Sequence, residues 1–195
     1  MRSIALPLSL LLAGLLTACA HPMVISPDLS KMRVVPVNQP ISKNVGYYIG
    51  DAKRQLKVVS AGGGGDGVSY KPYADTETAI YGVLNNVFGT VVVLKAADDS
   101  EAIRKHQLSY VIQPELKTRS TSSNPLLWAP TDFEVEILCT ITDAQGAPVA
   151  SPRVVGRGQG NVSEIRADPS ISGKRASADA MRQLQDALEN TPELR

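Results

Sequence analysis

The clearest pattern in the chain is an alternation of apolar and polar residues between positions 132 and 142, which Leu138 alone interrupts. Successive side chains of a β-strand point to opposite faces, so this alternation predicts a strand that buries one face. A turn is expected at 143–146, and 149–162 predicts a returning strand that is strongly bent or at a sheet edge, because it contains Pro152 and three glycines. The face expected to be buried carries Phe133, Val135, Ile137, Cys139 and Ile141.

Two longer segments repeat their apolar residues every three or four positions, which is the spacing of one face of an α-helix. The first covers 76–88, with Asp75 as the expected N-cap and Gly89 as the residue that lets the helix end. The second runs from about 174 to 190 and carries charged residues on its opposite face. A shorter helix is predicted over 100–106.

Shorter apolar runs predict the remaining strands. Five glycines among residues 62–67 predict a flexible hairpin turn between two of them. The order of strands and helices predicts an α+β fold, namely a single domain with a mainly antiparallel sheet and two main helices packed on one face. The runs cover 45–49, 56–59, 68–70, 90–94 and 110–116.

The N-terminal residues differ from the rest of the chain. An uncharged apolar run covers 4–16, and at 1.5 Å per residue it spans roughly 20 Å, which is short of the ~30 Å hydrocarbon core and typical of a signal peptide. Four prolines between positions 20 and 44 oppose a helix and predict an extended segment, with room for one edge strand against the domain. We therefore predict a signal peptide at 1–18, a Pro-rich tether at 19–44 and an α+β domain at 45–195.

The residues at the end of the signal peptide are Leu16, Thr17, Ala18 and Cys19. They resemble the lipobox of bacterial lipoproteins, in which an aliphatic residue and two small residues precede a cysteine. The resemblance implies that the Cys19 thiol carries a diacylglyceryl group, that cleavage falls between Ala18 and Cys19, and that the new amino group is acylated. In that family an Asp after the cysteine is the usual signal for retention in the inner membrane, so Ala20 implies the outer membrane. The alternative is an ordinary signal peptide with a coincidental cysteine.

The order of elements also resembles, in architecture alone, the small envelope lipoproteins of the YajG type. In these proteins a lipobox precedes a short α+β domain that ends in a helix. The resemblance implies the fold class and carries no active residue across to this chain.

Composition narrows the choice of partners and cofactors. The 20 Lys and Arg residues nearly balance the 19 Asp and Glu residues, so no basic surplus is present to neutralise phosphates and we expect no nucleic-acid partner. Two cysteines and two histidines are too few for a four-ligand zinc site. We expect no metal and no other cofactor.

The glycine-rich segment contains the letters of a dinucleotide-binding motif. Gly62, Gly64 and Gly67 satisfy G-x-G-x-x-G, but that motif needs a helix directly afterwards to hold a pyrophosphate. The following residues 68–72 include a proline and alternate in polarity, which opposes a helix. We expect a hairpin turn here and no bound nucleotide.

Few residues suggest catalysis. Cys139 lies in the middle of an apolar strand face, where a thiol behaves as a small hydrophobe. His106 ends a short helix without a second ligand nearby and is expected at the surface. Glu134 and Glu136 lie about 7 Å apart on one strand face, a spacing that a carboxylate pair could use and that solvated strands also produce. We predict no catalytic residues.

The loop at 124–130 places Leu126, Leu127 and Trp128 between two prolines. Apolar residues at a loop tip either fold back over the core or contact a partner protein or a lipid surface. Both interpretations are open from the sequence, and these three residues are the candidate partner contact.

Two classes of function fit these observations. The first is a non-catalytic accessory lipoprotein, attached to the outer membrane with its domain in the periplasm, that binds an envelope protein in assembly, transport or maintenance. The second is an envelope enzyme or small-ligand carrier with a pocket between the sheet and the helices.

Overall fold

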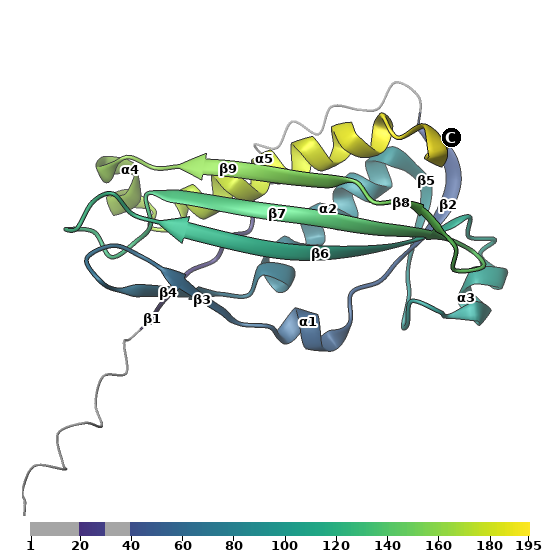
Figure 1. Ribbon diagram of the computed structural model, residues 1–195, viewed down its shortest axis with the longest axis horizontal. Coiled ribbons are helices and arrows are strands. Elements are labelled where there is room, and N and C mark those ends of the chain that lie inside the picture. The colour runs from purple at the N-terminus through teal and green to yellow at the C-terminus, as the bar shows by residue number, and fades with distance from the viewer. Residues whose placement is uncertain (1–19, 30–39) are drawn as a thin grey trace, which may run out of the picture.

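A computed structural model describes residues 20–29 and 40–195 of the chain. It confirms a single α+β domain with two main helices (Figure 1). No helix in these two segments is both long and apolar enough to cross a bilayer. The elements are β1 (Ala20–Pro22), β2 (Ile41–Tyr47), α1 (Asp51–Gln55), β3 (Val58–Ala61), β4 (Gly67–Tyr70), α2 (Pro72–Val87), β5 (Phe88–Val93), α3 (Ser100–Lys105), β6 (Tyr110–Thr121), β7 (Asp132–Asp143), β8 (Pro148–Ala150), β9 (Arg153–Gln159), α4 (Val162–Ala167), α5 (Ile171–Glu189) and a final 3-10 turn, Pro192–Leu194.

The larger sheet has the strand order β5-β2-β6-β7-β8, and β9 also pairs with β7. Its C-terminal part is antiparallel, as predicted: β6 and β7 form a long hairpin, and β8 and β9 follow the other edge of β7. The pairs β2–β5 and β2–β6 are parallel. Parallel pairing follows from the connections, because α2 lies between β2 and β5 in the chain and α3 lies between β5 and β6.

The smaller sheet joins the N-terminal segment to a hairpin, with the order β1-β4-β3. β3 and β4 are antiparallel across the glycine-rich turn, and β1 pairs with β4 in parallel. After β1, Met23 and Ile25 are buried in the main core. β1 is an edge strand of the kind that the sequence allowed in this segment, and the burial of Met23 and Ile25 was not expected from the prolines.

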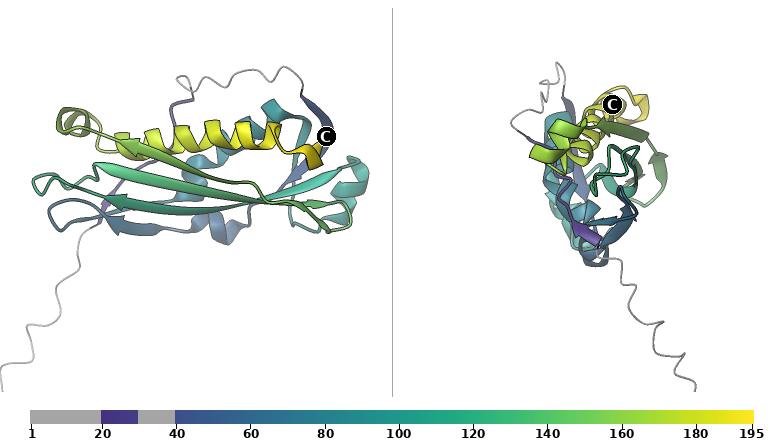
Figure 2. Two further views of the ribbon diagram at one scale, coloured as in Figure 1. Left: turned by 45° about the horizontal axis from the view of Figure 1, so that its top comes forward. Right: turned by 90° about the vertical axis from the view of Figure 1, so that its left-hand side faces the viewer.

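Both main helices cover one face of the larger sheet, and α5 lies along the length of the strands (Figure 2). Gly156 and Gly158 of β9 make this packing close. A Cβ atom on Gly156 would lie 2.2 Å from the Ala180 backbone nitrogen, and one on Gly158 would lie 2.1 Å from the Ser172 carbonyl oxygen. The small residues of α5 therefore pack directly on the backbone of β9.

The strand predicted over 149–162 is wrong in its extent. Pro152 separates β8 from β9, and β9 ends at Gln159. The chain then forms α4, whose first turn is closed by Asn161 and Glu164 in a capping box. The short helix α1 was also missed, since it buries no residue and leaves no apolar periodicity.

Two expected helix signals were also wrong. α2 begins at Pro72, a residue pre-organised for the first turn, so Asp75 is not its N-cap. Asp75 Oδ2 instead accepts a hydrogen bond from the Ile25 backbone N–H at 3.0 Å, and burial raises the pKa of Asp75. Gly89 lies within β5, because α2 passes into extended backbone at Phe88.

Candidate functional site

One end of the domain brings together the segments that the sequence singled out. The glycine turn at 62–66, the β6–β7 loop at 122–131 and α4 lie at this end, on the left in Figure 1 and in the left-hand view of Figure 2. We call it the loop end. β1 begins at the same end, because Ala20 pairs with Gly67 at the start of β4.

An aromatic contact connects the N-terminal strand to the β6–β7 loop. The imidazole of His21 stacks on the indole of Trp128, with ring centroids 4.3 Å apart. His21 Nε2 also lies 3.6 Å from the Asp66 carboxylate. Three segments that are distant in the sequence therefore meet around one histidine.

The glycine-rich segment is the hairpin turn that we expected. Gly64 and Gly65 have φ angles of 65° and 90°, in the left-handed region that glycine favours. Gly62 and Gly63 have a second role, because the β6–β7 loop packs directly against them. A Cβ atom on Gly63 would lie 1.9 Å from the Leu127 carbonyl oxygen, and the Gly63 N–H donates a hydrogen bond to the Trp128 carbonyl oxygen at 2.9 Å.

The structure separates the three apolar residues of the β6–β7 loop. Trp128 is half-buried and packs on the main core, and the adjacent Ala129 is buried. Leu127 is half-buried. Leu126 is 89% exposed. The core-closing interpretation therefore describes Trp128, while a partner contact stays a prediction that falls mainly on Leu126.

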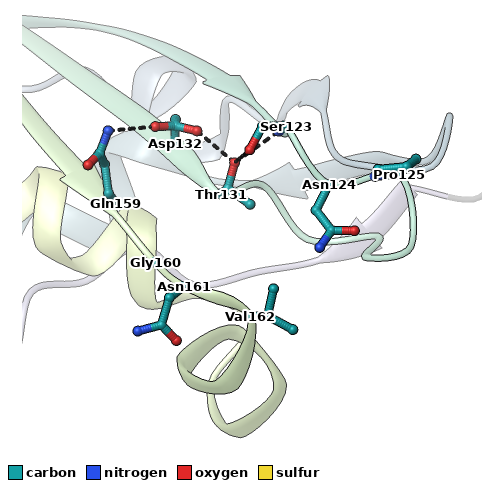
Figure 3. A pocket seen from close by; sticks show the side chains of 9 residues that line it. All are labelled: Ser123, Asn124, Pro125, Thr131, Asp132, Gln159, Gly160, Asn161 and Val162. Atoms are coloured by element: carbon teal, nitrogen blue, oxygen red, sulfur yellow. Dashed lines mark hydrogen bonds between the residues drawn. The ribbon is translucent and has the colours of Figure 1, made fainter.

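A hollow of about 580 Å³ lies beside this loop, between residues 123–125 and the segment that leads into α4 (Figure 3). The carboxylate of Asp132 lines this hollow. Its Oδ1 accepts a hydrogen bond from Gln159 Nε2 at 2.8 Å, and its Oδ2 accepts one from the Thr131 hydroxyl at 2.6 Å. These bonds hold the carboxylate as a structural brace between β7, β9 and the loop.

Cys19 and Ala18, the predicted acylation and cleavage residues, lie outside the described residues. The other single candidates are where the sequence placed them. Cys139 is fully buried, and burial raises the pKa of its thiol to about 12. His106 is exposed and ends α3, where its backbone N–H donates to the Ala102 carbonyl oxygen.

The carboxylates of Glu134 and Glu136 are engaged in ion pairs on the outer face of the sheet. Arg157 Nε donates to Glu134 Oε1 at 2.9 Å, and Arg153 donates through two nitrogens to both oxygens of Glu136 at 3.0 Å. The bidentate Arg153 contact lowers the pKa of Glu136. The two glutamates form a cross-strand charge ladder with the arginines of β9.

Apolar side chains fill the space between the larger sheet and the two main helices. The side chains that meet there are fully buried and come from α2, β7 and α5. No group of three or more His, Cys, Asp or Glu residues in the described segments is arranged to hold a metal ion. The filled layer is formed by Ile80, Leu84, Ile137, Ile141, Met181 and Leu184.

Sequence reasoning missed His21, Asp66 and the capping residues of α4 at the loop end. The Asn161-Val162-Ser163-Glu164 segment does carry the spacing of a capping box, and this signal could have predicted α4. The His21 contact has no comparable local signal, because it joins residues from two sheets.

No protein-family profile and no curated protein sequence matches this chain. Among solved structures, it is similar to a minor lipoprotein from Acinetobacter baumannii (14% identity, 76% of this chain and 94% of that chain, TM-score 0.45). It is also similar to a DUF330 protein from Xanthomonas campestris (10% identity, 88% and 93%, TM-score 0.46) and to PelC from Paraburkholderia phytofirmans, solved as a dodecamer (14% identity, 73% and 91%, TM-score 0.37). These TM-scores are below 0.5, so the function is argued from the chain's own residues.

Proposed function

We propose that this protein is a bacterial lipoprotein acylated at Cys19, anchored in the outer membrane, with its α+β domain in the periplasm as a non-catalytic accessory to an envelope protein. The observation that carries the proposal is the lipobox Leu16-Thr17-Ala18-Cys19. The modification requires a thiol at one position, and cleavage after Ala18 would leave Cys19 as the first residue of the mature chain. Three acyl chains at ~0.8 kcal/mol per buried methylene would hold such a chain firmly on a membrane.

The fold is compatible with cleavage at this point. β1 begins at Ala20 and pairs with β4 without any residue from the signal peptide.

The candidate catalytic side chains take part in hydrogen bonds or are buried, which supports the accessory role. Glu134, Glu136 and Asp132 each accept hydrogen bonds from neighbouring side chains, and the thiol of Cys139 is buried. These groups contribute to the stability of the domain, and we expect its surface to act in binding an envelope protein.

The decisive experiment is metabolic labelling with a palmitate analogue in a bacterium that processes lipoproteins, combined with the mass of the N-terminal peptide. We expect label on the wild type and on Cys139→Ala, the matched control that removes the other cysteine. Cys19→Ser should carry no label and should leave the membrane fraction, yet unfold cooperatively. Label on Cys19→Ser, or an unmodified Cys19 in membrane-bound wild type, would contradict the proposal.

A second comparison tests the choice of membrane. Ala20→Asp introduces the residue that retains lipoproteins in the inner membrane, and Ala20→Ser is its control. We expect the wild type and Ala20→Ser to co-fractionate with outer membranes and Ala20→Asp with inner membranes. Identical fractionation of all three would contradict the outer-membrane assignment.

A further inference from the structure

We propose that the loop end of the domain rests on the lipid bilayer, with Leu126 inserted into the interfacial region. This inference builds on the proposed acylation of Cys19 and specifies how the anchored domain is oriented.

No spacer residue separates the proposed anchor at Cys19 from β1, which begins at Ala20. Neighbouring Cα atoms are 3.8 Å apart, so an acylated Cys19 lies one residue from Ala20, which is already paired with Gly67 at the loop end. The next residue, His21, stacks on Trp128 of the β6–β7 loop. An anchor at this position holds the loop end at the membrane surface.

The loops at the loop end are poor in charged residues. Residues 60–65 and 120–131 contain no charged residue. The charged residues of the glycine turn and α4 are Asp66, Glu164 and Arg166, of which Glu164 is paired with Arg175. Removing a charge from water at a membrane is costly, so uncharged loops suit contact with lipid. Leu126 at 89% exposure and Val162 at 38% add apolar surface on this end, which gains free energy when it leaves water.

Hydrogen bonds within the protein hold the β6–β7 loop in place without a membrane. The Leu126 N–H donates to Asn124 Oδ1 at 2.9 Å, and the Gly63 N–H donates to the Trp128 carbonyl oxygen at 2.9 Å. Leu126 is therefore presented on an ordered loop, and its insertion orders little additional chain. The acyl chains and this leucine together form a two-part attachment to the membrane.

The test uses the full-length chain with Leu126→Cys, labelled with an environment-sensitive fluorophore. Under the proposal Cys19 is acylated, and Cys139 is fully buried, so the introduced thiol is the accessible one. Wild-type protein treated with the same fluorophore should take up no label, which checks this. The matched control is Gln145→Cys, an exposed position in the β7–β8 turn. It lies at the other end of β7, roughly 40 Å away at 3.4 Å per residue.

The labelled proteins are reconstituted into vesicles of phosphatidylethanolamine and phosphatidylglycerol. We expect a blue-shifted emission at position 126 and several-fold stronger quenching by nitroxide-labelled lipids than at position 145. Emission typical of water at both positions, in protein that floats with the vesicles, would refute the lipid contact while leaving the anchor intact.

Two further outcomes separate the alternatives. Failure of the protein to float would refute the anchor and the inference together, and N-terminal peptide mass would show the missing acyl groups. A shift at position 126 in native membranes but not in pure lipid vesicles would refute the bilayer as the occupant, because it would indicate a protein partner on this loop.

Discussion

The indole of Trp128 lies almost parallel to the imidazole of His21, with an interplanar angle of 26° and centroids 4.3 Å apart. The contact joins a loop between two long strands to the first strand of the described chain. Because Trp128 also packs on the main core, it ties the N-terminal segment to the body of the domain. Its neighbour Leu126 makes no comparable contribution to the core, so the two residues can be separated experimentally.

Replacing Trp128 with Ala should therefore destabilise the domain. Truncation of a buried aromatic residue typically costs 3–5 kcal/mol, and we expect about 2–3 kcal/mol for this half-buried one. Urea denaturation of the non-acylated Cys19→Ser protein measures this value without a membrane. Leu126→Ala in the same background should change the free energy of unfolding by less than about 0.5 kcal/mol. Equal losses from both substitutions would show that the loop tip is part of the core.

Gly156→Ala should be among the most damaging single-methyl changes in this protein. The added Cβ would lie 2.2 Å from the Ala180 backbone nitrogen and 2.3 Å from the Ala176 carbonyl oxygen. Backbone atoms cannot rotate away as a side chain can, so α5 must move off β9. We expect a loss of about 3 kcal/mol or more, measured by thermal or urea unfolding.

The matched control is Gly82→Ala, which adds the same methyl group to the exposed side of α2. A Cβ atom there meets nothing within 4 Å, and Ala favours a helix over Gly. We expect this variant to be more stable by about 0.5–1 kcal/mol. If both substitutions moved stability in the same direction, steric contact between β9 and α5 would not be the cause.

The stability of the domain should depend on pH through Glu164 of α4. A hydrogen-bonded ion pair with Arg175 and a hydrogen bond from the Asn161 N–H lower the pKa of Glu164 to about 2. The unfolded chain has an ordinary value of about 4.3. A carboxylate with a lower pKa in the folded state stabilises the fold above the unfolded pKa, and this contribution disappears as the pH falls from about 4.3 towards 2.

The measurement compares the wild type with Glu164→Gln across this range of pH. The difference in free energy of unfolding should be constant at neutral pH and should shrink as Glu164 becomes protonated. Arg175→Gln, which removes the main cause of the lowered pKa, should weaken the pH dependence. A difference that is the same at pH 2 and pH 7 would contradict the assignment to Glu164.

The sequence predicted the helices and strands that bury one face, because their apolar residues recur at a regular spacing. β7 and α5 each bury one face. Buried residues therefore recur every second position in β7, as at Phe133 and Val135, and four positions apart in α5, as at Ala176 and Ala180. It could not predict that β2 is parallel to both neighbours, because an apolar run carries no information about the direction of the adjacent strand. The position of Met23 and Ile25 in the core also escaped prediction, since the prolines around them dominated the local pattern.

The loop end was predicted in part. The apolar loop around Trp128 and the glycine turn were identified separately, each from its own composition. Their contact was not predicted, because it depends on two hairpins from different sheets meeting at one end. Glycine at positions 62 and 63 predicts a turn whether or not the backbone of the β6–β7 loop packs against it.

The order of the strands also constrains when the domain can complete its folding. β2 has neighbours on both sides that are made much later, and α2 packs against α5, the last long helix. The N-terminal half alone, up to β5, has neither the second strand beside β2 nor the helix α5 that covers α2. Folding is therefore completed only when the C-terminal helix is available, and until then the apolar face of α2 is exposed to aggregation and is a natural target for a holding chaperone.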